Sequence, residues 1–137
     1  MAEKYSSEQT TINSGNKVDS VLFNGRVRLR RATITMAEQA IDDTIVLCNA
    51  KRGEVFAYGV INASVTAGST ATIEVGTSAD TDKYRAAATK TSTAPELFGI
   101  AGSQIQLTTD EKIIATIKAA ALPASGTLVI DMYFSTV

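Results

Sequence analysis

The stretch TLVIDMYFSTV, residues 127–137, alternates along its length between two kinds of side chain. Its even-numbered positions hold four large apolar residues, Leu128, Ile130, Met132 and Phe134. The odd-numbered positions between them include Asp131 and Tyr133. Because successive side chains of a β-strand point to opposite faces of the sheet, this pattern predicts a strand with its even-numbered side chains in a core.

Similar alternation, rich in threonine, valine and isoleucine, recurs along most of the chain. It predicts further strands over residues 26–36, 44–50, 54–65, 70–77, 103–109 and 113–119. Turn sequences such as AKRG (50–53), TAGS (66–69) and LPASG (122–126) separate them. About eight short strands at this spacing predict an all-β fold, an antiparallel β-sandwich of the jelly-roll type.

Three of these segments carry more specific predictions. In RVRLRRATITM (26–36) the apolar residues change from odd positions to even ones near Arg30, which predicts a bulge or bend where the strand crosses between sheets. TIVLCNA (44–50) is apolar on both faces, which predicts a central, covered strand. Gly59 lies inside the 54–65 segment and indicates a kink or a close approach of another part of the chain.

The length of 137 residues suits one domain with a substantial core. Residues 1–16 are polar and do not alternate, so we interpret them as an extended arm that a partner would order. Residues 17–137 form the predicted sandwich domain. The N-terminus has no apolar segment typical of a signal peptide, and no apolar run is long enough to span a membrane.

The composition argues against most catalytic and metal chemistry. There is no histidine, which removes the commonest general base and the commonest metal ligand. The one cysteine, Cys48, has apolar neighbours typical of a buried, inert thiol, and it cannot form an internal disulfide. Neither a P-loop nor a G-x-G-x-x-G motif occurs. We therefore expect a protein that is not an enzyme and that needs no metal, cofactor or small-molecule substrate.

The segment VGTSADTDKYRAAAT (75–89) concentrates polar side chains, among them Asp80, Asp82, Tyr84 and Arg85. Two carboxylates could serve a glycosidase, but the chain has no tryptophan and only 6% aromatic residues to line a sugar groove. A calcium loop would need further oxygen ligands, and the basic residues nearby would repel the ion. A turn is the simplest interpretation, and contact with a protein partner is the alternative, because tyrosine and arginine are enriched at binding hot spots.

A second cluster, RVRLRR (26–31), places Arg26, Arg28 and Arg30 on one face of a strand. Such a stripe could be a solvated face, a protein interface or a phosphate-binding surface. Nucleic-acid binders usually add aromatic platforms or a larger basic excess, and this chain has a net charge of −1. We therefore favour a solvated face or a protein interface, and expect neither nucleic acid nor a membrane surface as partner.

Residues 42–131 contain the sequences DDTIVLC, SVTAGSTATIEVGTSADTDKYRAAAT, APELFG and ALPASGTLVI. With these features the chain resembles the capsid cement, or head decoration, proteins of short-tailed phages, such as that of a Bordetella phage. The resemblance does not include the N-terminal arm or the arginine stripe. It implies a jelly roll without enzymatic activity that binds the outside of an icosahedral head and bridges neighbouring major capsid protein subunits.

The resemblance also implies self-association as a dimer or trimer, and synthesis in the host cytoplasm before incorporation into the virion. Apolar residues that one core face does not need are candidates for the contact between copies: Phe56, Tyr58 and Val60. Contact with the capsid is expected through Arg26, Arg28, Arg30, Asp80, Asp82, Tyr84 and Arg85, with the arm lying on the capsid. The alternative is a receptor- or glycan-binding virion module, such as a head fibre or a tail component.

Overall fold

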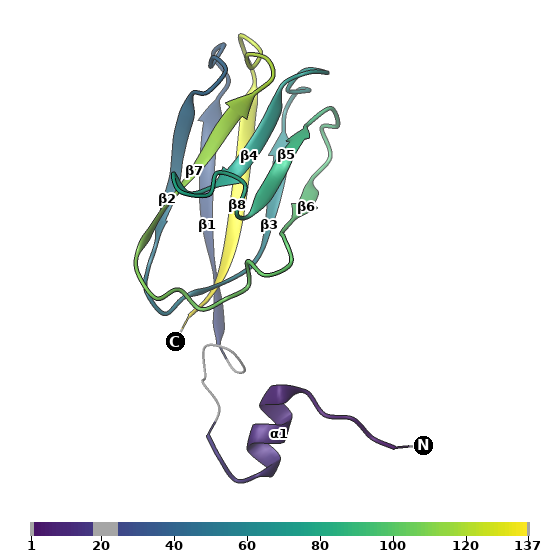
Figure 1. The fold of residues 1–137 in the computed structure, drawn as a ribbon. Coiled ribbons are helices and arrows are strands. Elements are labelled where there is room, and N and C mark those ends of the chain that lie inside the picture. The colour runs from purple at the N-terminus through teal and green to yellow at the C-terminus, as the bar shows by residue number, and fades with distance from the viewer. Residues whose placement is uncertain (1, 18–24, 137) are drawn as a thin grey trace.

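The computed structural model describes residues 2–17 and 25–136, which form one short helix and eight strands (Figure 1). The helix is α1 (Ser7–Asn13). The strands are β1 (Arg26–Thr35), β2 (Thr44–Ala50), β3 (Val55–Ala63), β4 (Thr72–Gly76), β5 (Arg85–Thr89), β6 (Glu96–Phe98), β7 (Glu111–Lys118) and β8 (Thr127–Thr136).

The strands form two four-stranded antiparallel sheets packed face to face, in the orders β1-β8-β3-β6 and β2-β7-β4-β5 (Figure 1). In this order the chain passes repeatedly from one sheet to the other, as it does in a jelly roll. The predicted all-β sandwich of about eight strands is confirmed.

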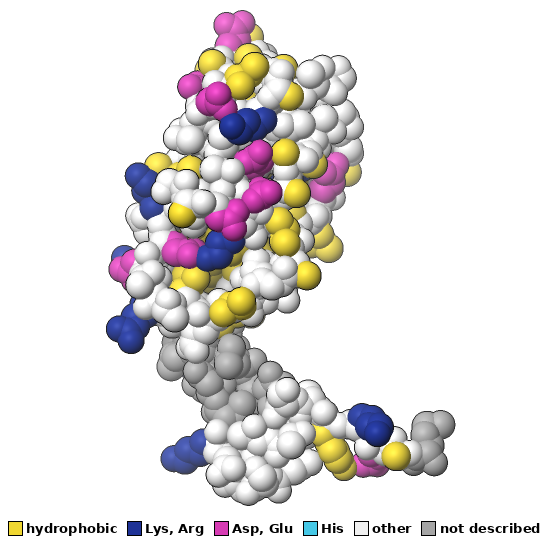
Figure 2. All heavy atoms as spheres, viewed as in Figure 1, with side chains coloured by type: hydrophobic (Ala, Val, Ile, Leu, Met, Phe, Trp, Pro, Cys, Tyr) yellow, Lys and Arg dark blue, Asp and Glu magenta, His cyan; other side chains and the backbone are white. Residues whose placement is uncertain are grey.

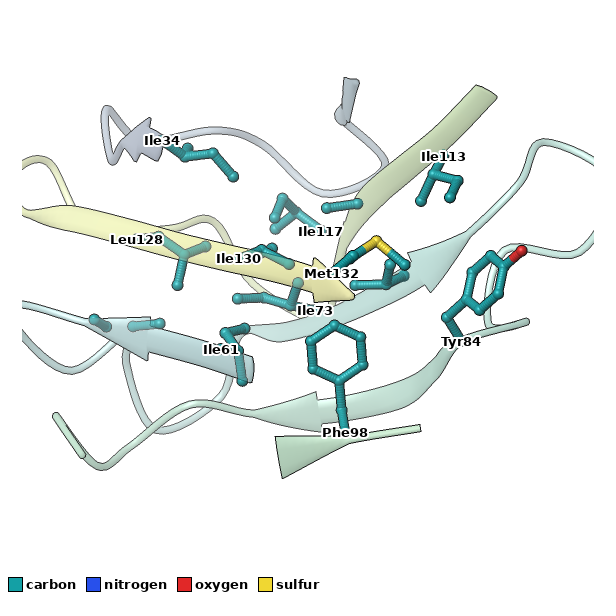
Figure 3. Packing of buried hydrophobic residues seen from close by; sticks show 14 of the residues in the cluster. Ile34, Ile61, Ile73, Tyr84, Phe98, Ile113, Ile117, Leu128, Ile130 and Met132 are labelled. Carbon is teal, nitrogen blue, oxygen red and sulfur yellow. The ribbon is translucent and has the colours of Figure 1, made fainter. Parts of the chain in front are cut away.

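The core lies between the sheets and is built from alternating positions of the central strands (Figure 3). The predicted even-numbered residues of β8 are all buried: Leu128, Ile130, Met132 and Phe134. β7 contributes Ile113 and Ile117 from the opposite sheet. Aromatic rings close one part of the core, where Phe56 packs 4.7 Å from Tyr84 and 5.8 Å from Phe134 between ring centroids.

Gly59 confirms the predicted close approach. A Cβ atom added to Gly59 would lie 2.1 Å from the ring of Phe98, so only glycine lets the β6 side chain lie across β3 at this point. The two residues are paired in the ladder between β3 and β6. Because Gly59 has no side chain, the outer strand β6 can lie against β3 at this point.

The predicted bend in the 26–36 segment is wrong. β1 pairs with β8 in one unbroken register from Arg26 opposite Thr136 to Thr35 opposite Thr127. Ile34 faces the core, so the even-numbered arginines share its side of the sheet, and Val27 and Leu29 project outward with exposed fractions of 58% and 45%. The apolar residues at odd positions in β1 are therefore an exposed pair, and the change from odd to even positions does not mark a bulge.

Two other predictions fail at the edges of the sheets. β2 lies at an edge and exposes Val46, so it is not the central strand, a place that β7 occupies. Residues 103–109 are not a strand, although Leu107 is buried and exchanges backbone hydrogen bonds with Gly53 and Glu54. The sequence did not predict β5 and β6. Strand β5 has five residues, most of them alanine, and β6 has three residues.

The N-terminal arm is not wholly extended, because α1 begins after Ser6, whose side chain accepts a hydrogen bond from the Gln9 backbone N–H. Figure 1 draws α1 apart from the sandwich, and the main packing contacts among the described elements all join strands. Residues 18–24, which belong to the predicted 17–137 domain, lie outside the described residues, so the boundary after residue 16 stays a prediction. Within 2–17 and 25–136, no helix is long and apolar enough to cross a membrane.

Candidate functional site

The polar loop between β4 and β5 is a compact turn stabilised by its own backbone. The Thr77 N–H donates to the Asp80 carbonyl at 2.9 Å, and the Asp80 N–H donates to the Thr77 hydroxyl at 3.2 Å. Gly76 permits this path, because a Cβ atom there would lie 2.2 Å from the Asp80 carbonyl oxygen. The predicted turn is present, and it places the Asp80 and Asp82 side chains in solvent.

The two exposed carboxyl groups of this turn interact with each other. A hydrogen bond with Asp82 is the main cause that raises the pKa of Asp80, followed by desolvation and by the negative charge of Asp82. No group of three or more His, Cys, Asp or Glu side chains in the described parts of the chain is placed to hold a metal ion.

Tyr84 follows the turn and is buried in the core, with none of its surface exposed. Its hydroxyl donates to a carboxylate oxygen of Glu111 at 2.6 Å, and Lys83 forms an ion pair with the other oxygen. Burial, and then the hydrogen bond to Glu111, raise the pKa of Tyr84. In this structure the Tyr84 side chain joins the turn to β7 and presents no surface to a partner.

Arg85 is also buried, with 6% of its surface exposed. Its guanidinium donates to the carbonyls of Ile73, Ala88 and Thr89, where the ladder between β4 and β5 changes register. Burial lowers the pKa of Arg85. The side chain thus satisfies carbonyl groups at the irregular end of the sheet, and the accessible part of the loop is limited to its acidic tip.

The arginines of β1 divide into two pairs. Arg30 donates to both carboxylate oxygens of Glu54 at 2.8 and 2.7 Å and lies 4.8 Å from the centre of the Phe134 ring. Arg31 makes a two-point contact with Asp131 at 2.8 and 3.0 Å. Arg26 and Arg28 are exposed, and within the described residues neither side chain forms an ion pair or a hydrogen bond.

The outer face of the β1-β8-β3-β6 sheet carries an apolar surface that the sequence pattern did not predict. Its most exposed members are Val27, Leu29, Tyr58 and Leu97, and Leu97 is 76% exposed. The register places Leu29 beside Tyr133 and Tyr133 beside Tyr58, and the two tyrosine rings stack with centroids 4.5 Å apart. We call this surface the tyrosine face.

Of the residues predicted for self-association, Tyr58 lies on the tyrosine face and Val60 is half-buried beside it in the ladder with Leu97. Phe56 is 1% exposed and belongs to the core, because a register shift between Phe56 and Tyr58 turns its side chain inward. The signal for this face was the pair of apolar residues at odd positions in β1, which we interpreted as one side of a strand that bends near Arg30.

The described surface has several hollows, and one of about 360 Å³ is lined in part by Asp80, Asp82 and Lys83. A cavity of about 370 Å³ is lined by amide, hydroxyl and small apolar groups, including Asn62, Ser64 and Thr127. Cys48 is half-buried, and burial raises the pKa of its thiol, which disfavours the reactive thiolate. Figure 2 shows acidic, basic and apolar side chains intermingled over the visible face of the sandwich.

Comparisons with known proteins connect this fold to solved capsids. A chain in the capsid asymmetric unit of cyanophage Pam1 is similar over 84% of this chain and 88% of its own, with a TM-score of 0.65 and 17% identity. A chain in the capsid of Ralstonia phage GP4 is similar over 82% of this chain and 86% of its own, with a TM-score of 0.66 and 17% identity.

A third similar chain comes from the acid-stable capsid structure of Helicobacter pylori bacteriophage KHP30, with 80% and 87% coverage, a TM-score of 0.57 and 12% identity. No protein-family model and no curated protein sequence matches the chain. At these identities the similarity is one of fold, and it covers most of each chain compared.

Proposed function

We propose that the chain is a structural protein of a phage virion: a cement protein that binds the outside of the head and bridges neighbouring major capsid protein subunits. It has no enzymatic activity in this proposal, and it is made in the host cytoplasm before it joins the capsid. Its partners are the major capsid protein and other copies of itself.

The observation that carries this proposal is the shared fold of chains in three phage capsid structures, which extends over at least 80% of this chain in each. The surface fits the same role, because exposed apolar residues gather on the tyrosine face and two arginines of β1, Arg26 and Arg28, have no ion-pair partner among residues 2–17 and 25–136. Apolar patches of this kind mark protein contacts more often than catalytic sites.

Stabilisation by such a protein is multivalent. A modest contact per copy becomes a strong constraint when one oligomer touches several capsid subunits that must separate together. Particles that lack the chain should therefore release their DNA at a lower temperature than complete particles.

The test compares particles of the phage that encodes the chain with particles from which its gene has been deleted. DNA release on heating, followed with a fluorescent dye, should occur at a lower temperature for the deletion particles, and adding the purified protein should restore the original value. Equal release temperatures, with no binding of the added protein, would contradict the proposal.

A further inference from the structure

The four outer strands of the two sheets differ in how well they are protected against pairing with another chain. An edge strand exposes backbone N–H and C=O groups, and proteins commonly shorten or bulge such strands. β6 has three residues, β5 is short and irregularly paired with β4, and β2 shifts register between Val46 and Cys48. These three edges are poor templates for another strand.

β1 has none of these features. It has ten residues, its register with β8 is unbroken, and β8 is its one strand neighbour within the described parts of the chain. Its backbone therefore offers a straight, long edge on the side away from β8.

The side chains of the first half of β1 alternate between charge and apolar surface. Arg26 and Arg28 lie on one side and have no ion-pair or hydrogen-bond partner among the described residues. Val27 and Leu29 lie on the other side and are about half exposed. Arg30 and Arg31 differ, because Glu54 and Asp131 already neutralise them.

The same charges make a second copy of β1 an unsuitable partner. Residues directly opposite each other in an antiparallel pair lie on the same face of the sheet, about 4.5–5.5 Å apart. A symmetric pair of β1 strands centred on Arg28 or Arg30 would place an arginine against its own copy, and like charges in this position are destabilising. The complementary strand has acidic side chains opposite Arg26 and Arg28 and apolar side chains beside Val27 and Leu29.

From this we infer that the free edge of β1 is a strand-addition site for an extended segment of a capsid subunit in which acidic and apolar side chains alternate. Backbone hydrogen bonds along the edge supply affinity, and the alternating side chains supply specificity. The inference rests on the proposed function for the source of the segment, but the geometry of β1 defines its chemistry.

A synthetic peptide tests this chemistry without a capsid. The probe is a capped octapeptide that alternates glutamate and valine, titrated into the full-length ¹⁵N-labelled protein. We expect chemical-shift changes and slowed amide exchange concentrated in residues 26–31. A block peptide of the same composition, four glutamates followed by four valines, should bind at least about threefold more weakly, because only alternation serves both sides of the edge.

Charge reversal supplies the matched variants. Arg26→Glu with Arg28→Glu should weaken binding of the glutamate–valine peptide by about tenfold and should favour a lysine–valine peptide instead. The control is Arg52→Glu with Lys112→Glu, which makes the same change of net charge at two exposed positions elsewhere and should leave peptide binding unchanged. Because all four side chains are exposed, both variants should fold.

Three results would overturn the inference: no shift changes at millimolar peptide, changes centred on β2, β5 or the tyrosine face, or equal binding by the charge-reversed variant. Tighter binding of a DNA oligonucleotide to Arg26 and Arg28 would also overturn it, in favour of a nucleic-acid surface. Binding to phage particles separates this inference from the proposed function. If wild type and the charge-reversed variant bind particles equally well, only the strand-addition site is wrong; if neither binds, the proposed function fails.

Discussion

The Tyr84 hydroxyl shows how a residue that the sequence presents as a surface anchor can serve the core. Burial and the hydrogen bond to Glu111 raise the pKa of Tyr84 in the folded protein. In the unfolded chain tyrosine titrates at about pH 10, so ionisation of Tyr84 favours unfolding. The stability that Tyr84 contributes through this difference is fully present below that pH and is lost as the pH rises above it.

We therefore expect the free energy of unfolding to fall above about pH 10 by up to about 1.4 kcal/mol per pH unit from this group. Tyr84→Phe should be less stable near neutral pH, because Glu111 loses the hydrogen bond from Tyr84 and keeps the ion pair with Lys83, but it should lose less stability at alkaline pH. Urea denaturation at about pH 8 and about pH 11 measures how far the free energy of unfolding falls with pH in the wild type and in the variant. The half-buried Cys48 thiol is present in both proteins, so identical slopes would show that Tyr84 ionises freely in the folded state.

At the scale of elements, we expect α1 and the residues around it to be separable from the sandwich. The main packing contacts join strands, so deleting residues 1–16 should change the free energy of unfolding of the sandwich by less than about 0.5 kcal/mol. The same deletion should weaken binding to capsids, because the arm is proposed to lie on them. Thermal unfolding and particle co-sedimentation check the two halves of this prediction. Loss of folding on deletion would mean that the arm is part of the sandwich.

The strands that the sequence predicted are those whose alternation has a buried face. β8 and β7 are central, so their apolar positions report directly on the core. β5 could not be predicted in the same way, because Ala86, Ala87 and Ala88 have little strand preference and are exposed. The helix had a local signal in Ser6 and Gln9, a capping pair that we did not use.

The candidate surfaces were less predictable, because apolar residues of β1 are exposed and a charged residue of β5 is buried. The alternation of Val27 and Leu29 predicted a strand that bends near Arg30, whereas β1 continues without a bend, exposes both residues and turns Arg30 toward Glu54. Tyr84 and Arg85 were assigned to a contact surface, whereas both are buried. Tyr84 is bound to Glu111 of β7, and Arg85 is bound to carbonyl groups of β4 and β5. The pairing of these three strands within one sheet sets both contacts, and the local pattern of residues 75–89 does not contain it.

At the scale of the whole molecule, the tyrosine face should bring copies of the chain together. Exposed apolar area on one sheet face favours association by about 25 cal/mol per Å² removed from water, and the stacked tyrosines add rigid contact surface. The purified protein should sediment as an oligomer at about tens of micromolar, and Tyr58→Ser with Leu97→Ser should shift it toward monomer.

Ile105→Ser is the matched control for this prediction, because Ile105 is 66% exposed but lies in the loop between β6 and β7. It should leave the sedimentation of the protein unchanged. A wild-type protein that is monomeric at these concentrations, or a control that dissociates as readily as the double variant, would contradict association through the tyrosine face.

The position of this sandwich in the virion decides whether the chain is part of a phage head. Electron cryomicroscopy of particles of the encoding phage should show two packed four-stranded sheets on the outer surface of the capsid, each copy touching more than one major capsid subunit. Density for this fold on the tail alone, or its absence from complete particles that contain every other capsid protein, would contradict the account.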